Sequence, residues 1–123
     1  MFDRFFPDRY VASTYVIDFE KLYEEGVRGL IFDIDNTLVP HGAPADERAK
    51  ELFARLKAIG FRCCLISNNQ KPRVEMFNKD IQVDYVYNAH KPSTRNYLRA
   101  MEIMGTDRKS SVFIGDQLFT DVW

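Results

Sequence analysis

The sequence predicts an α/β protein built on a Rossmann-like parallel sheet, and three observations support this fold class. Short apolar runs alternate with helical patterns along the chain from Gly29 onward. Glycine or proline separates many of these segments from their neighbours. Polar clusters directly follow the apolar runs. Strands that alternate with helices form parallel sheets with right-handed crossovers, and the helices cover both faces.

Apolar periodicity defines the elements of the first half of the chain. Gly29–Asp33 is a short apolar strand. Apolar residues at three- and four-residue steps predict a helix over Asp46–Ile59, which Gly60 ends. Phe61–Ile66 is the second strand. After a polar loop, Pro72 opens a short helix, because proline is favoured in the first helical turn.

The second half repeats this alternation. Asp84–Tyr87 is predicted to be a short third strand, and Ser93–Met104 a helix that ends at Gly105. Ser111–Ile114 is the predicted fourth strand. A chain of 123 residues can bury the core of one such domain but is too short for a second lobe.

Residues 1–28 show no regular pattern. We expect them to form a lead-in that packs on a core formed by residues 29–123. Three phenylalanines, Phe2, Phe5 and Phe6, stand within the first six positions. Two roles are open for this cluster: a flap over the core, or a peripheral contact with a membrane surface or a partner.

Composition excludes several classes of protein. Hydrophobic residues make up 46% of the chain and charged residues 28%, which is ordinary for a globular domain. The 17 basic and 18 acidic residues give a net charge of −1, and no basic tract is present, so nucleic-acid binding is not expected. The apolar runs are too short for a membrane-spanning helix, and the N-terminus lacks the pattern of a secretory signal.

Cys63 and Cys64 are neighbours in an apolar segment. Adjacent strand residues point to opposite faces and rarely form a disulfide, so we expect two reduced core thiols and a cytoplasmic protein. No further Cys or His stands at ligand spacing, which argues against a metal site at these thiols. The sequence does not indicate an oligomeric state.

Polar residues stand at or beyond the carboxyl end of each predicted strand, where ligands bind in open parallel sheets. In strand order they are Asp33 and Asp35, then Ser67 and Asn68, then Lys91, and finally Asp116. Acids two positions apart in an extended chain project from the same face, so Asp33 and Asp35 are expected to share one small space. These residues are predicted to converge on one edge of the sheet.

This set of side chains fits phosphoryl transfer. Asp33 would attack phosphorus and form an aspartyl-phosphate. Asp35, with a pKa raised by its anionic neighbour, would protonate the leaving oxygen and then deprotonate the attacking water. Lys91 would offset the negative charge of the phosphoryl group. A Mg²⁺ ion held by Asp33, Asp35 and Asp116 would supply further positive charge.

Other polar residues have two interpretations each. Ser67 and Asn68 are predicted to bind phosphoryl oxygens, against an ordinary polar loop. Asn69 is a further candidate for substrate or supporting contacts. Asp121 is a candidate metal ligand, or alternatively the cap of a helix. Asn36 suits a turn that needs a left-handed backbone.

Four charged or titratable residues near the same edge are expected to be ordinary surface groups. His41 and His90 are predicted to be surface histidines that flank the site. Lys71 and Arg73 could meet an anionic headgroup, but solvated charges at the start of a helix are the simpler interpretation.

Four segments, in order, resemble the motifs of haloacid dehalogenase superfamily phosphatases. The resemblance implies that the fold is their core, with the strand order 4-1-2-3, and that the substrate is a phosphate monoester. Motif by motif, the segments are Asp33-Ile34-Asp35-Asn36-Thr37, then Ser67-Asn68-Asn69, then Lys91-Pro92, and Gly115-Asp116-Gln117-Leu118-Phe119-Thr120-Asp121.

Short connectors between the first three motifs leave no room for a cap domain. The chain therefore resembles subclass IIIA, and within it the YqeG family and the related phosphatidylglycerophosphate phosphatases; Pro7-Asp8-Arg9-Tyr10 supports this likeness. A lipid phosphate at a membrane surface, or a small phosphomonoester, is the substrate that this implies. The family usually continues beyond motif IV, so we expect a core that lacks its last strand and helix and leaves the fourth strand as a bare edge.

Two non-enzymatic functions are the alternatives. A phosphate-responsive switch of the receiver type also uses an acid pair, a hydroxyl residue and a lysine. Its phospho-accepting Asp follows the third strand, however, where this chain offers Asn88 and His90. The second alternative is an adaptor that keeps the fold without the activity.

Overall fold

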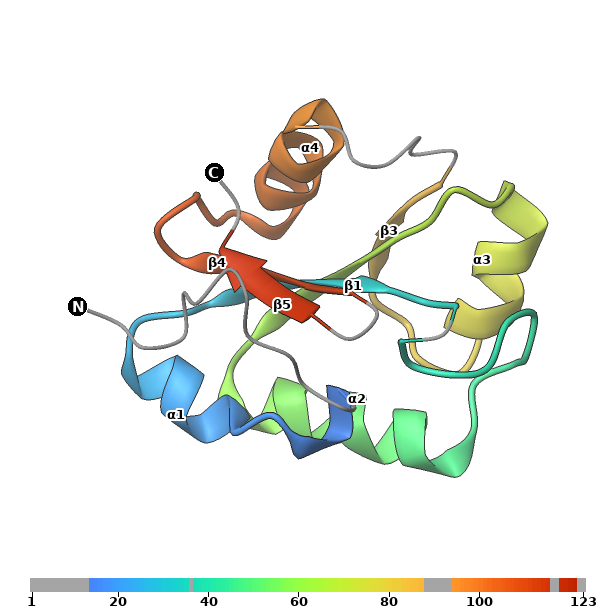
Figure 1. Ribbon diagram of the computed structural model, residues 1–123, viewed down its shortest axis with the longest axis horizontal. Coiled ribbons are helices and arrows are strands. Elements are labelled where there is room, and N and C mark those ends of the chain that lie inside the picture. The colour runs from blue at the N-terminus through green and yellow to red at the C-terminus, as the bar shows by residue number, and fades with distance from the viewer. Residues whose placement is uncertain (1–13, 36, 88–93, 116–117, 122–123) are drawn as a thin grey trace.

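A computed structural model describes residues 14–35, 37–87, 94–115 and 118–121 of the chain. Their framework is a five-stranded sheet with the spatial order β3-β2-β1-β4-β5 (Figure 1). The strands are β1 Gly29–Asp33, β2 Arg62–Ile66, β3 Asp84–Val86, β4 Ser111–Gly115 and β5 Leu118–Asp121. Strands β1 to β4 run parallel in the predicted order 4-1-2-3, which confirms the α/β fold class.

The fourth strand is not the bare edge that the sequence suggested. Strand β5 pairs antiparallel with β4, with Val112 opposite Asp121 and Gly115 opposite Leu118. Only two positions separate the strands in sequence, which is the connection length of a tight hairpin. Because Asp121 belongs to β5, it does not cap a helix. The strand propensity of Leu118-Phe119-Thr120 is the signal in the sequence that indicates β5.

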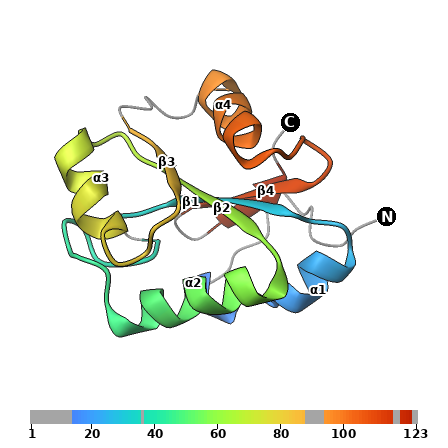
Figure 2. The same cartoon turned by 180° about the vertical axis from the view of Figure 1, so that it is seen from behind.

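Helices cover both faces of the sheet (Figures 1 and 2). One face carries α1 and α2, and buried residues of α3 join the same core; α4 packs on the opposite face against β2, β3 and β1. This follows from right-handed crossovers, since the chain moves outward from β1 to β3 and then returns across the sheet to β4. Their bounds are α1 Phe19–Glu24, α2 Glu47–Ile59, α3 Lys71–Asn78 and α4 Thr94–Met104.

The segment before β1 is more regular than its pattern indicated. A 3₁₀ turn covers Thr14–Val16, and α1 follows, with the Asp18 carboxylate accepting a hydrogen bond from the Lys21 amide at 3.1 Å. Phe19 and Leu22 of α1 are buried in the core. A helix of six residues presents too few apolar positions to show a helical period, so its pattern does not predict it.

Helix α2 has both of its predicted boundaries. The Asp46 carboxylate accepts a hydrogen bond from the Ala49 amide at 2.8 Å, which satisfies one unpaired donor of the first turn. Gly60 ends the helix at a φ of +122°, a backbone conformation that favours glycine. Leu52 and Leu56 bury the intervening apolar stripe.

The two faces of the sheet belong to two separate cores. Cys63 points into the core under α1 and α2, whereas Cys64 points into the smaller core under α4. Both thiols are buried and free, which confirms that they do not bridge. Among the described helices, none has the length and apolar composition needed to cross a bilayer.

Candidate active site

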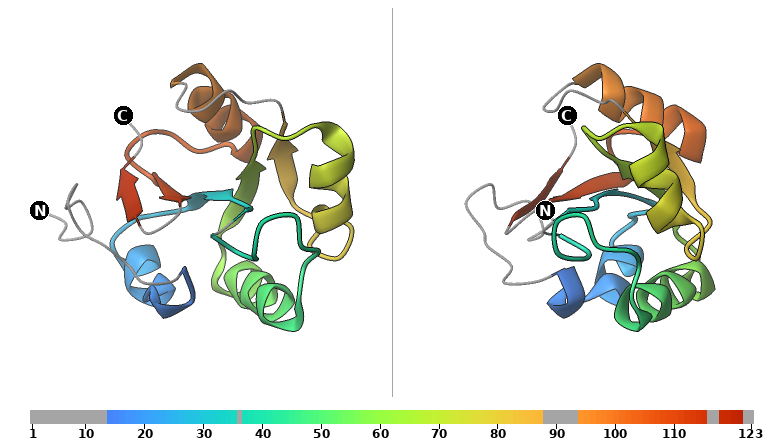
Figure 3. Two further views of the ribbon diagram at one scale, coloured as in Figure 1. Left: turned by 45° about the vertical axis from the view of Figure 1, so that its right-hand side comes forward. Right: turned by 90° about the vertical axis from the view of Figure 1, so that its right-hand side faces the viewer.

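The carboxyl ends of the central strands place the first two motifs side by side (Figure 3). Strand β1 ends at Asp33, which pairs in register with Ile66, the last residue of β2. Ser67 follows at once, and its amide donates to the carbonyl of Val86 in β3 at 3.0 Å. The predicted meeting of Asp33 and Ser67 at one edge of the sheet is therefore present.

Asp33 also meets the start of motif IV. Its half-buried carboxylate lies beside Gly115, the last residue of β4, where an added Cβ would stand 3.4 Å from Asp33 Oδ2. The same Cβ would stand 2.8 Å from the Phe113 ring. Glycine at this position therefore leaves room both for the carboxylate and for the aromatic side chain.

Three segments donate hydrogen bonds to Asp35. Its Oδ1 accepts hydrogen bonds from the Gly42 amide at 2.8 Å and from Arg73 Nη2 at 2.7 Å. Its Oδ2 accepts from Asn69 Nδ2 at 2.9 Å. A carboxylate held by donors at both oxygens cannot rotate freely, so its orientation is fixed by the surrounding fold.

Arg73 is not the solvated helix-start charge that the sequence suggested. Only 13% of its side-chain surface is exposed, and its guanidinium forms an ion pair with Asp35. The side chain stands in the first turn of α3, directly before Val74, which is fully buried. Sequence reasoning missed this role because a lysine and an arginine at the start of a helix give the same pattern whether they face water or a carboxylate.

The pKa of Asp35 lies below its usual value, in contrast to the predicted increase. Burial raises the pKa of Asp35. The hydrogen bonds from Arg73 and the Gly42 amide, together with the charges of Arg73 and His41, lower this pKa by more than burial raises it. The sequence showed only the neighbouring acid, whereas the fold adds a guanidinium at 2.7 Å. Asp35 is therefore a carboxylate in the resting site.

The motif II residues differ in their surroundings. Ser67 is 3% exposed, and its Oγ accepts a hydrogen bond from the Asn69 amide at 3.0 Å, which fixes the turn after β2. Asn69 then reaches Asp35 with its side chain. Asn68 is exposed between them. The turn thus directs one asparagine toward the acid pair and leaves the other at the surface.

The other predicted site residues are His41, which the structure describes, and several residues outside the described ranges. His41 is exposed, as expected, although its Nδ1 stands 3.9 Å from Asp35 Oδ1 and pairs with it when protonated. Lys91 and Asp116 lie outside the residues that the structure describes, as do Asn36 and His90. For Asp121 the structure describes the strand and not the side chain.

The acids of the described site, Asp33 and Asp35, offer oxygen ligands, which suit Mg²⁺ better than a softer metal. Asp33 is the acid beside Gly115, while both carboxylate oxygens of Asp35 already accept hydrogen bonds. Among the described residues, no three His, Cys, Asp or Glu side chains gather as a metal site. A complete Mg²⁺ site therefore needs the third predicted ligand, Asp116.

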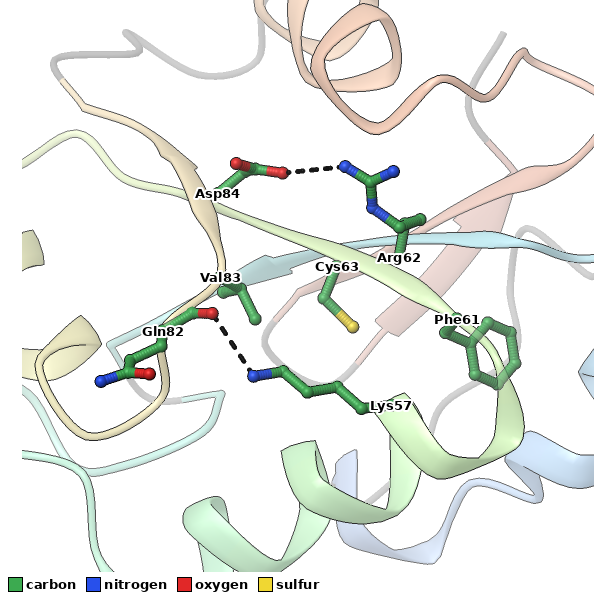
Figure 4. A pocket seen from close by; sticks show the side chains of 7 residues that line it. All are labelled: Lys57, Phe61, Arg62, Cys63, Gln82, Val83 and Asp84. Carbon is green, nitrogen blue, oxygen red and sulfur yellow. Dashed lines mark hydrogen bonds and ion pairs between the residues drawn. The ribbon is translucent and has the colours of Figure 1, made fainter.

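A separate cavity of about 280 Å³ lies at the opposite edge of the sheet, where β2 and β3 begin (Figure 4). Its charged groups have partners in the lining: Lys57 Nζ donates to the Gln82 carbonyl at 3.4 Å, and Arg62 pairs with Asp84 at 3.5 Å. Asp84 is the single carboxylate in this lining. The candidate chemistry therefore lies at the carboxyl edge of the sheet.

Comparison with known proteins identifies the family of the chain. The haloacid dehalogenase-like hydrolase family matches residues 43–123. The probable phosphatase YqeG of Bacillus subtilis (strain 168) is 40% identical over 119 residues, which are 96% of this chain and 69% of the relative.

Solved structures share the fold at low sequence identity. A candidate 3-deoxy-D-manno-octulosonate 8-phosphate phosphatase from Vibrio cholerae aligns with a TM-score of 0.63 at 15% identity, covering 90% of this chain and 69% of that protein. A candidate hydrolase from Streptomyces avermitilis aligns with a TM-score of 0.58 at 13% identity, covering 72% of this chain and 60% of that protein. The match to the family and the identity to its Bacillus relative together show that the chain belongs to the haloacid dehalogenase-like hydrolase family.

Proposed function

We propose that this chain is a phosphatase that hydrolyses a phosphate monoester through an aspartyl-phosphate on Asp33. The observation that carries the proposal is the carboxylate of Asp35, which Gly42, Asn69 and Arg73 hold two positions after Asp33, the residue that ends β1 at the edge of the sheet. Membership in the hydrolase family and the kinship to a probable phosphatase support the same reaction. The chemistry of the residues, rather than the fold alone, gives each acid its role.

In the first step an Asp33 oxygen forms a bond to phosphorus, and the bond from phosphorus to the leaving oxygen breaks. Asp35 gives a proton to that oxygen, so that a neutral alcohol departs. In the second step Asp35 takes a proton from water, whose oxygen attacks phosphorus and releases Asp33. A dianionic phosphoryl group beside Asp35 favours its protonated form, which opposes the effect of Arg73 in the resting site.

We propose Mg²⁺ as the cofactor, with Asp33, Asp35 and Asp116 as its ligands. Because the side-chain oxygens of Asp35 already accept hydrogen bonds, its main-chain carbonyl is the oxygen that it offers. The ion supplies positive charge that neutralises the phosphoryl oxygens. Lys91 adds a second charge, and Ser67 and Asn68 are proposed to bind phosphoryl oxygens.

The proposed substrate is a lipid phosphate, with phosphatidylglycerophosphate as the first compound to test and a small phosphomonoester as the alternative. In residues 37–87, α2 and α3 are the only helices, so this part of the chain carries no inserted cap domain over the edge of the sheet. An uncapped site admits a bulky headgroup. A peripheral contact with a membrane surface, and a cytoplasmic location, belong to the same proposal.

Phosphate release from p-nitrophenyl phosphate with Mg²⁺ tests the reaction. We expect Asp33→Asn to abolish turnover, because an amide cannot act as the nucleophile, and EDTA to abolish it reversibly. Asp80→Asn, a change of the same kind at an exposed position, should leave turnover unchanged. Unchanged turnover in Asp33→Asn would contradict the mechanism.

Two further measurements define the function more closely. A panel of lipid and soluble phosphates identifies the preferred substrate by kcat/KM, and a preference for soluble esters over phosphatidylglycerophosphate rejects the lipid assignment. A stable beryllofluoride adduct on a chain without turnover would favour the phosphate-responsive switch over the enzyme.

A further inference from the structure

We propose that Arg73 positions Asp35 for proton transfer by holding its carboxylate in one orientation. This inference rests on the proposed phosphatase function and adds a residue to it. Arg73 acts through Asp35 and is therefore a positioning residue.

The acceptor sites of Asp35 are filled unequally. A carboxylate oxygen has two lone-pair sites. Among the described residues, Oδ1 accepts two hydrogen bonds, from Gly42 and Arg73, at 2.8 and 2.7 Å. Among the same residues, Oδ2 accepts one, from Asn69 at 2.9 Å. Donors at both oxygens, with two of them at Oδ1, hold the carboxylate in one orientation.

The burial of Arg73 is hard to explain by stability alone. Asp35 is the only side chain in the described residues that pairs with its guanidinium. The Nε and Nη1 atoms of Arg73 are buried and have no hydrogen-bond partner among the described residues. A buried ion pair with unfilled donors rarely stabilises a fold relative to apolar residues. The placement of this arginine against Asp35 therefore points to a role in the reaction.

Helix α3 holds Arg73 in place. The neighbouring residue Val74, and Phe77 one turn later, are fully buried in the larger core. Asn69, four positions before Arg73, donates to the other oxygen of the same carboxylate. Asn69 and Arg73 therefore hold Asp35 from the loop before α3 and from its first turn, and Gly42 holds it from the loop between β1 and α2.

An Asp35 carboxylate held in the wrong orientation should slow substrates with poor leaving groups more than substrates with good ones. The proton that it transfers neutralises the leaving oxygen, and a poor leaving group needs that proton more than a good one does. Loss of Arg73 should therefore slow phenyl phosphate far more than p-nitrophenyl phosphate. A loss of phosphate binding or a loosened fold would instead slow both substrates to the same degree.

The experiment measures kcat and KM of wild type, Arg73→Ala and Arg73→Lys on a series of aryl phosphates, with circular dichroism as a check of folding. For Arg73→Ala we expect kcat on phenyl phosphate to fall ~10–100-fold, within the contribution of acid–base catalysis, and kcat on p-nitrophenyl phosphate to fall less than ~3-fold. Arg73→Lys should recover part of the loss, because an ammonium keeps the charge without the planar fork.

Controls separate this role from a structural one. Arg55→Ala removes an exposed arginine that is also ion-paired, with Glu20 at 3.4 Å, and should leave the series unchanged. In an Asp35→Asn background, adding Arg73→Ala should change kcat less than ~2-fold, because residues that act as a unit are not additive. If Arg73→Ala fails to fold, Arg73→Lys carries the comparison of leaving groups.

Each outcome supports or overturns one claim. An equal loss on all substrates, a change in KM alone, or no loss overturns the positioning role and leaves the phosphatase function intact, provided that Asp33→Asn is inactive. A wild-type chain without turnover on any substrate overturns the proposed function, and the positioning role with it.

Discussion

Asp35 receives hydrogen bonds from residues that lie 7, 34 and 38 positions further along the chain. Those donors, rather than the neighbouring acid, decide the direction of its pKa shift, because hydrogen bonds and charge at short distance favour the ionised form. The two motif II asparagines share a side-chain type and differ in what they face. Residue type by itself therefore does not assign a role at this site.

A comparison of Asn69→Ala with Asn68→Ala tests that difference. Asn69→Ala removes the donor to Asp35 Oδ2, so we expect kcat to fall about 10-fold, as for a lost hydrogen bond to a charged group, with little change in KM. Asn68→Ala, at the adjacent exposed position, should raise KM instead, as proposed for a phosphate ligand. Steady-state kinetics on one aryl phosphate checks both, and identical effects of the two changes would contradict the assignment.

Gly115→Ala tests the contact between β4 and Asp33. The new Cβ would stand 2.8 Å from the Phe113 ring, so the ring must shift, and 3.4 Å from Asp33 Oδ2, which is an ordinary contact distance. We expect a loss of about 1–3 kcal/mol in the free energy of unfolding, the usual effect of overpacking, together with reduced turnover. Chemical denaturation measures the first quantity. The double variant Gly115→Ala/Phe113→Leu should recover stability, and a failure to recover would show that the ring is not the obstacle.

The ends of the helices show how local sequence sets an element and how tertiary contacts constrain it. Gly60 ends α2 and Gly105 follows α4, and both have a positive φ, at +122° and +72°. A Cβ on Gly60 would meet the Tyr23 hydroxyl at 2.8 Å, whereas one on Gly105 would meet nothing within 4 Å. The backbone requirement is shared by the two glycines, but the contact with α1 is specific to Gly60.

This pair of glycines offers a matched experiment. Gly60→Ala and Gly105→Ala should each lower the free energy of unfolding by about 1 kcal/mol through backbone strain. Gly60→Ala should lower it by a further amount, because Tyr23 must leave its edge-on contact with the Phe61 ring, at 5.3 Å between centroids. Thermal melts of both variants check this. Equal losses would mean that Tyr23 moves aside without effect.

At the scale of the whole molecule, two cores on opposite faces of one sheet each bury a thiol. Burial raises the pKa of Cys63 and of Cys64 from 9.0 to about 12. In the folded protein these thiols keep their protons above pH 9, whereas an unfolded chain releases them. Unfolding therefore becomes easier as the pH rises from 9 toward 12.

Alkaline denaturation should show this linkage. Above pH 9 the free energy of unfolding should fall by about 1.4 kcal/mol per pH unit for each thiol, and below pH 9 this contribution should be constant. Urea titrations between pH 8 and 10 measure the slope. The double variant Cys63→Ala/Cys64→Ala should be less stable at pH 8, because of the cavities left behind, but should have a shallower slope. An unchanged slope would mean that other groups control it.

Sequence pattern predicted the strands and helices from β1 to β4 and missed α1 and β5. Helix α2 shows several apolar positions between a capping Asp46 and a terminal Gly60, and its observed bounds agree with the prediction. Helix α1 and strand β5 are only six and four residues long. Too few positions fall within them to establish a period, so tertiary packing and strand pairing decide their conformation.

The sequence by itself determined the alternation of strands and helices from β1 to β4 and the meeting of Asp33 with Ser67 at one edge of the sheet. Both depend on local pattern and on the fixed hand of crossover connections. Only the tertiary structure decided that Arg73 faces Asp35 and that the pKa of that acid falls. The physical reason is distance: charges act through space over a few ångströms, and only the fold brings residues 38 positions apart to 2.7 Å.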